Sequence, residues 1–202
     1  MGEYALERKA YQKLTDWKNS DRRKPLIMNG ARQVGKTWLL KEFGQREYDN
    51  VAYISCETDP VMQGAFTDFD VQRLIRVFSA LTNEQITPGK TLIILDEIQE
   101  VSRAITSLKY FSEDAPQYHI AAAGSLLGVA MHTGTGYPVG KVDEITIFPM
   151  TFMEFLKAVH QDLLVDHNAG MTGWRFSMSG YMEQEWMINI PLYFVGEWVI
   201  SH

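Results

Sequence analysis

The stretch Gly30-Ala31-Arg32-Gln33-Val34-Gly35-Lys36-Thr37 has the form G-x-x-x-x-G-K-T and decides the fold of this 202-residue chain. It follows the apolar run 26–28 and precedes residues 38–43, which have an amphipathic helical pattern that we expect to close at Gly44. A strand, a glycine-rich loop and a helix in this order form a phosphate-binding loop. We therefore expect residues 30–37, together with Trp38, to bind a nucleoside triphosphate.

Two side chains of this loop have predicted chemical roles of their own. Lys36 is expected to neutralise the outer phosphates, and the hydroxyl of Thr37 is expected to ligate Mg²⁺. The alternative is a glycine-rich turn that merely enters an ordinary helix. The flanking strand and helix patterns make the nucleotide site the better interpretation.

A second informative stretch is Thr91-Leu92-Ile93-Ile94-Leu95-Asp96-Glu97. Its continuous apolar run is typical of a strand that is buried on both faces in a parallel sheet. Two adjacent carboxylates at the end of such a strand are costly unless a cation compensates them, and Mg²⁺ with a nucleotide supplies that cation. We expect Asp96 to hold the coordination shell of the metal, and Glu97 to polarise the water that attacks the γ-phosphate.

The order of the remaining elements predicts an α/β fold. The pattern places strands near residues 25–28, 51–56, 91–95, 119–123 and 142–148, with helices over 4–18, 36–43, 70–81 and around 105–111. This alternation predicts a three-layer P-loop NTPase sandwich around a five-stranded parallel sheet.

The sequence predicts that the chain has two parts. Residues 1–160 form the ATPase domain, which ends in a helix that starts with a capping box at Thr151 and Glu154. Residues 161–202 are poor in Lys and Arg and rich in Met and Trp. We expect this segment to be a partial lid or the remnant of a second domain that seeks a partner surface.

Composition narrows the function further. The net charge of −6 gives no global basic field, so nucleic-acid binding is not supported. The single cysteine, Cys56, is expected to be a buried apolar residue, and none of the five histidines has metal-ligand spacing. The absence of a signal-peptide pattern and of a membrane-length apolar run predicts a cytoplasmic protein.

The chain resembles the AAA-14 type of prokaryotic AAA+ ATPases. The stretches that carry the resemblance are 29–37 followed by Leu39-Leu40, Leu95-Asp-Glu-Ile-Gln99, Ala123-Gly-Ser-Leu126, and 137–141 running into Ile147-Phe-Pro-Met-Thr-Phe-Met-Glu-Phe155. The resemblance implies ATP with Mg²⁺, hydrolysis, and an acidic strand inserted beside the P-loop strand.

Three further residues are interpreted against this pattern. Ser125 follows a predicted strand at the place where such ATPases carry a small polar residue that contacts the γ-phosphate or the attacking water. Lys141 stands where family members usually have an arginine. If this position serves as an arginine finger, lysine keeps the positive charge but cannot donate the two parallel hydrogen bonds of a guanidinium group. Arg175 is a weak candidate for a second sensing arginine.

Several functions remain open from the sequence. The first is an ATP hydrolase that drives conformational change in a protein partner or through self-association. The second is a nucleotide-dependent switch with little hydrolysis, which Lys141 and the short C-terminal segment favour. A small-molecule kinase would need an acceptor pocket, whereas the Asp96-Glu97 pair favours water as the acceptor. A DNA-associated ATPase lacks any helix-turn-helix signal.

Overall fold

The computed structural model describes residues 9–59, 61–124 and 137–149, together with the backbone of three strands between residues 173 and 191. The chain separates into two compact units. One is Glu7–Thr151, and the other consists of Met1–Leu6 with Phe152–His202.

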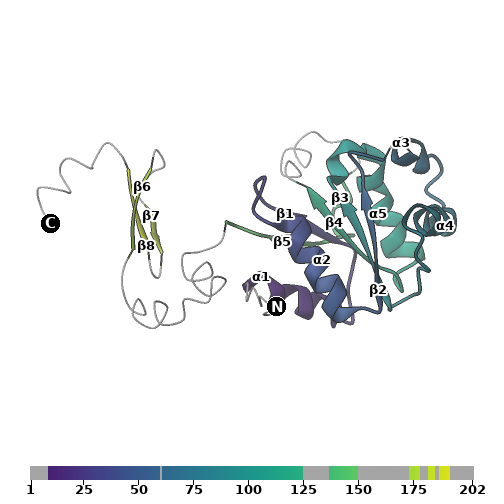
Figure 1. Cartoon of the computed structure of the whole chain (residues 1–202), viewed down its shortest axis with the longest axis horizontal. Coiled ribbons are helices and arrows are strands. Elements are labelled where there is room, and N and C mark those ends of the chain that lie inside the picture. Colours follow the sequence, from purple (N-terminus) through teal and green to yellow (C-terminus); the bar gives the residue numbers. More distant parts are fainter. Residues whose placement is uncertain are drawn as a thin grey trace, which may run out of the picture. The chain divides into compact units, whose positions relative to one another are not determined.

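The first unit is built on a parallel sheet of five strands in the order β2-β3-β4-β1-β5 (Figure 1). The strands are β1 (Leu26–Asn29), β2 (Asn50–Ser55), β3 (Thr91–Asp96), β4 (His119–Gly124) and β5 (Asp143–Thr146). All four pairings are parallel, so the carboxyl ends of the strands meet at one edge of the sheet. The sheet and its flanking helices confirm the predicted α/β fold. The expectation that the acidic strand lies beside the strand of the phosphate-binding loop is wrong, because β4 lies between β3 and β1 and pairs with both.

Among the described helices, one precedes β1, and the others lie between β1 and β4 along the chain. The helices are α1 (Lys9–Lys18), α2 (Lys36–Glu47), α3 (Val61–Ala65), α4 (Val71–Thr82) and α5 (Ser102–Asp114), with a short 3₁₀ turn, η1 (Ile98–Glu100), between β3 and α5. Helix α4 begins at Asp70, whose carboxylate accepts a hydrogen bond from the backbone N–H of Arg73.

Alternate residues of the strands face the two helical layers, because side chains in a strand point to opposite faces. Leu26, Leu92 and Ile94 pack with residues of α1 and α2. Ile93 and Leu95 pack on the other face with residues of α3, α4 and α5. The sheet is therefore the middle layer of a three-layer sandwich.

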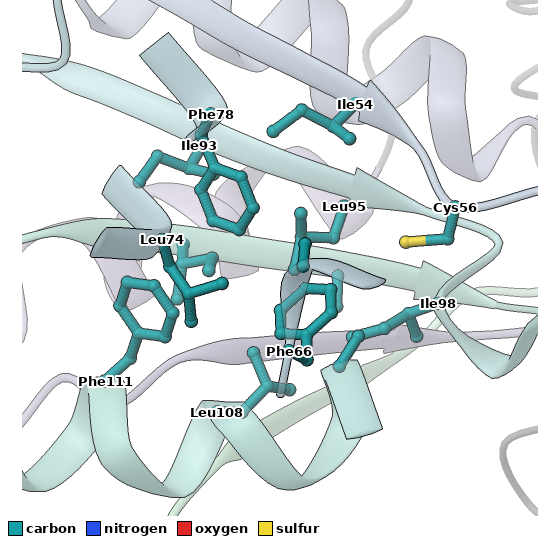
Figure 2. Close-up of a cluster of buried hydrophobic side chains, with 14 of the residues drawn as sticks. Ile54, Cys56, Phe66, Leu74, Phe78, Ile93, Leu95, Ile98, Leu108 and Phe111 are labelled. Atoms are coloured by element: carbon teal, nitrogen blue, oxygen red, sulfur yellow. The ribbon is translucent and has the colours of Figure 1, made fainter. Parts of the chain in front are cut away.

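The core on the α4 and α5 face is rich in aromatic residues (Figure 2). Phe66, Phe78 and Phe111 are each no more than 1 % exposed, and Cys56 lies at the edge of the same cluster. Burial raises the pKa of the Cys56 thiol to about 12. The expectation that Cys56 is a buried apolar residue is confirmed.

The prediction that α2 closes at Gly44 is wrong. The helix continues to Glu47, and Gly44 is one of its buried residues. A Cβ atom at this position would lie 2.5 Å from Cγ2 of Val51 and 3.1 Å from Cδ2 of Leu92. Gly44 thus allows α2 to approach the sheet closely; its role is in packing rather than in ending the helix.

The second unit contains a three-stranded sheet of order β6-β8-β7, formed by β6 (Gly173–Ser177), β7 (Met182–Gln184) and β8 (Met187–Pro191). Strand β8 pairs in parallel with β6 and antiparallel with β7. The predicted helix that starts at Thr151 lies outside the described residues. The lid or remnant role of residues 161–202 stays a prediction.

Candidate functional site

The glycine-rich loop joins the carboxyl end of β1 to the amino end of α2, as the sequence predicts. Gly30 has a φ of 155°, and a Cβ atom there would lie 2.4 Å from the backbone oxygen of Ile147. Gly35 has a φ of 87° and immediately precedes the first helical residue. A side chain at Gly30 would therefore push the loop away from the end of β5, so the motif glycine is required by geometry.

Lys36 is the first residue of α2 and is only 6 % exposed. Its Nζ atom donates to the backbone oxygens of Gly30 and Ala31 at 2.9 and 2.8 Å. Burial lowers the pKa of Lys36, and the charges of Glu97 and Asp96 oppose that shift. The ammonium group is thus held inside the curve of the loop, beside the two carboxylates.

The hydroxyl of Thr37 contacts the carboxylate of Asp96, which comes from the end of β3. It lies 3.0 Å from Oδ1 and 2.9 Å from Oδ2, and Asp96 is 7 % exposed. A hydroxyl and a carboxylate side by side are oxygen ligands of the kind that Mg²⁺ takes. Within the described ranges no group of three or more His, Cys, Asp or Glu residues is arranged to hold a metal. A Mg²⁺ ion bound here would take further oxygen ligands from phosphate groups, as Mg²⁺ commonly does in proteins.

The same carboxylate has a contact that the sequence did not indicate. Tyr53, in β2, donates its hydroxyl to Oδ2 of Asp96 at 2.9 Å. Burial and this hydrogen bond raise the pKa of Tyr53 to about 12, so the phenol keeps its proton near neutral pH. No signal in the sequence marks Tyr53, because it is one of several aromatic residues in strand patterns.

Glu97 follows Asp96 in a left-handed conformation, with φ 49° and ψ 45°. Its backbone N–H donates to Oδ1 of Asp96 at 3.2 Å, and its Oε2 accepts a hydrogen bond from Nε2 of Gln99 at 2.5 Å. A left-handed residue other than glycine costs on the order of 1 kcal/mol or more and is enriched at functional sites. Gln99 belongs to the Leu95–Gln99 motif, but the sequence alone gave it no role.

A hollow of about 260 Å³ opens where these elements meet. Its lining residues are Arg32 and Gln33 from the loop, Glu57 after β2, and Glu97 and Glu100 after β3. Gln33 is also left-handed, with φ 62°. The hollow therefore lies at the carboxyl edge of the parallel sheet, where ligands bind in open α/β folds.

Not every predicted site residue lies at this edge. Lys141 precedes β5, which runs parallel to β1, so it lies at the opposite edge of the sheet from the loop. Its Nζ atom pairs with Oε1 of Glu113 at 2.9 Å. A finger role for Lys141 stays a prediction, and it would require the site of another subunit.

The remaining predicted residues are placed as follows. Val34 lies buried in the loop, and Trp38 is 43 % exposed in the first turn of α2. Ser125 lies outside the described residues. Arg175 belongs to β6, of which only the backbone is described.

The sequence matches a family model described as an AAA domain, of the AAA-14 type, over residues 22–156. That match covers the phosphate loop, the acidic strand and β5. The chain belongs to the AAA-14 family of AAA domains. No curated protein matches it in sequence.

One solved structure supports the fold of this AAA domain. The Walker-type ATPase PABY2304 of Pyrococcus abyssi is similar with a TM-score of 0.51 and 16 % identity, over 80 % of this chain and 59 % of that one. The present chain thus spans about three fifths of that structure. The ORC1 protein of Aeropyrum pernix, solved in complex with DNA, has a TM-score of 0.48 and 13 % identity, over 79 % and 48 % of the two chains.

Family membership gives this chain a nucleotide-binding, ATPase-like function. In the part of the chain that the structure describes, no helix has both the length and the apolar character needed to cross a membrane.

Proposed function

We propose that this AAA domain binds ATP with Mg²⁺ at residues 30–38 and hydrolyses it to ADP and phosphate. The observation that supports this most strongly is the contact between Thr37 and Asp96, with Glu97 and the buried Lys36 beside it. The ammonium group of Lys36 can then neutralise phosphates, and Asp96 at the end of β3 can hold a metal ion. The carboxylate of Glu97 stays available to act on water.

Each side chain then has a defined task. Lys36 and the backbone N–H groups at the start of α2 hold the outer phosphates. Thr37 would ligate the metal, and Asp96 would hold its coordination shell through water. Mg²⁺, when bound, withdraws charge from the β- and γ-phosphate oxygens.

Glu97 acts on the attacking water. One of its carboxylate oxygens is held by Gln99, so the other is available to accept a hydrogen bond from water. A bond forms between the water oxygen and the γ-phosphorus while the bond to the bridging oxygen of ADP breaks. The water proton passes through Glu97 to the released phosphate.

The use of this cycle is proposed to be conformational change in a protein partner or in a second copy of the chain. If Lys141 acts as a finger, it must do so in a second copy of the chain, because it lies at the opposite edge of the sheet from its own phosphate-binding loop. Specific activity would then rise with protein concentration.

A second candidate function is a nucleotide switch with little turnover. Two observations favour it: Gln99 restrains Glu97, and Lys141 is paired with Glu113 away from the loop. This AAA domain would then bind ATP and present a surface to its partner without releasing phosphate.

Phosphate release in the presence of Mg²⁺ separates the two functions. We compare the wild type with Glu97→Gln, which keeps the size of the side chain but removes its basicity. We expect at least a hundredfold loss of turnover, the usual size of a general-base contribution, with ATP binding retained. Glu100→Gln is the matched control, since Glu100 also lines the hollow but is the last residue of the 3₁₀ turn rather than the residue directly after β3.

Three outcomes have different meanings. Turnover that is lost in Glu97→Gln and kept in Glu100→Gln supports the hydrolase. ATP binding without turnover in any of the three proteins supports the switch. Equal turnover in all three contradicts the role of Glu97.

A further inference from the structure

The carboxylate of Asp96 accepts hydrogen bonds from three different parts of the fold. Thr37 comes from α2, the backbone N–H of Glu97 follows β3, and the hydroxyl of Tyr53 comes from β2. The first two belong to the motifs that define the proposed nucleotide site. Tyr53 does not, and no nucleotide-binding role accounts for its contact.

The register of the sheet explains how Tyr53 reaches Asp96. Ser55 lies beside Asp96 in the parallel pairing of β2 and β3, and Tyr53 is two residues earlier on the same face of β2. Helix α2 covers that face of the sheet. Tyr53 is partly buried there and packs against the core cluster formed by α1, α2 and the strands. The phenol therefore extends toward the carboxyl edge of the sheet and ends at Oδ2 of Asp96.

The ring of Tyr53 is itself held in place by α2. The Nζ atom of Lys41 lies 3.3 Å from the centroid of the ring, in a cation–π contact. Lys41 is one turn after Thr37 in the same helix. Helix α2 thus supplies one ligand candidate through Thr37. Through Lys41 it also fixes the phenol that orients Asp96, the carboxylate proposed to hold the coordination shell through water.

We propose that Tyr53 is a positioning residue of the magnesium site: its hydroxyl holds the Asp96 carboxylate in the orientation that receives the cation together with the phosphates of ATP. This inference rests on the proposed function. Without the phenol, Oδ2 would keep only the Thr37 hydroxyl, whose single proton lies between Oδ2 and Oδ1. Partners of this kind, which orient a ligand without touching the metal, typically change metal affinity 10- to 100-fold when removed.

The test uses Tyr53→Phe, which removes only the hydroxyl oxygen. Binding of the non-hydrolysable analogue AMP-PNP is measured by titration calorimetry in EDTA and then at increasing Mg²⁺. In EDTA we expect an affinity within twofold of the wild type. The Mg²⁺ concentration that gives half of the affinity gain is expected to rise by about 10-fold or more.

Tyr11→Phe is the matched control. It also removes a hydrogen bond from a tyrosine to a carboxylate, because the Tyr11 hydroxyl donates to Oε1 of Glu47 at 3.3 Å. Glu47 is the last residue of α2, at the end away from the loop. This variant should keep the Mg²⁺ requirement of the wild type.

Two results would contradict the positioning role of Tyr53 without contradicting the proposed function. One is an unchanged Mg²⁺ requirement in Tyr53→Phe. The other is a loss of AMP-PNP binding in EDTA as well, because Tyr53 would then support the fold of the site rather than its metal. If the wild type binds AMP-PNP without any gain from Mg²⁺, the proposed magnesium chemistry fails, and the inference that rests on it fails too.

Discussion

At the scale of single residues, the site depends on buried polar groups whose partners come from distant parts of the sequence. Thr37 and Asp96 are 59 positions apart, and Tyr53 and Asp96 are 43 positions apart. Hydrogen bonds to a charged group contribute about 1.5–3 kcal/mol each, so these contacts fix the carboxylate before any ligand arrives. Such preorganisation is what electrostatic stabilisation of a phosphoryl-transfer transition state needs.

His119 is a second buried polar residue, at the edge of the sheet away from the loop. It is 7 % exposed, and its Nδ1 lies 2.7 Å from the hydroxyl of Tyr48. Burial lowers the pKa of His119 to about 4, and the positive charges of Arg23 and Lys18 act in the same direction. The folded protein therefore holds this imidazole neutral.

The pH dependence of stability follows from that shift. The unfolded state binds a proton at His119 below about pH 6.5, whereas the folded state does so only near pH 4, so stability falls as the pH drops through this window. Between pH 8 and pH 5 the expected loss from His119 is about 2 kcal/mol. Urea unfolding of the wild type and of His119→Gln at both pH values isolates this contribution. If both proteins lose the same stability between pH 8 and pH 5, the pH dependence does not come from His119.

The residue scale also shows where sequence reasoning stops. The motif residues Lys36, Thr37, Asp96 and Glu97 are recognisable because their spacing and flanks are informative, and the structure brings them together. Tyr53 reaches Asp96 only through the register of β2 against β3, a relation that no local pattern encodes.

At the scale of elements, the order and type of the strands and helices from residue 9 to residue 147 follow the predicted pattern closely. The apolar runs of β1, β3 and β4 are long enough to be read as buried strands, and α4 has a clear apolar face. The end of α2 does not follow local rules. A glycine near the end of a helical pattern normally indicates a stop, but here packing against the sheet decides its role.

Gly44 gives a prediction at this scale. A methyl group added by Gly44→Ala would collide with Val51 and approach Leu92, so we expect a loss of about 1–3 kcal/mol despite the better helix propensity of alanine.

Gly64→Ala in α3 is the matched control for that prediction, because nothing lies within 4 Å of the added Cβ atom. It should leave stability unchanged or raise it by up to about 1 kcal/mol. Chemical unfolding measures both variants. If Gly44→Ala is as stable as Gly64→Ala, the close approach of α2 to the sheet is not the reason for the glycine.

At the scale of the whole molecule, the two edges of the five-stranded sheet carry different chemistry. The carboxyl edge holds the loop, the acidic pair and the hollow. The amino edge holds Lys141 with Glu113, and His119 near Arg23. If Lys141 acts on a bound nucleotide, the amino edge of one copy of the chain must therefore face the carboxyl edge of another copy. A head-to-tail contact of this kind forms a ring when its rotation closes and an open filament when it does not.

The central claim is that residues 30–38 bind ATP through Lys36. The most direct measurement is the free energy of unfolding with and without saturating ATP and Mg²⁺, in the wild type and in Lys36→Ala. A ligand that binds only the folded state adds about 2.7 kcal/mol at a hundred times its dissociation constant. We predict that gain in the wild type and little or none in Lys36→Ala. No gain in the wild type, or an equal gain in both proteins, would contradict the account.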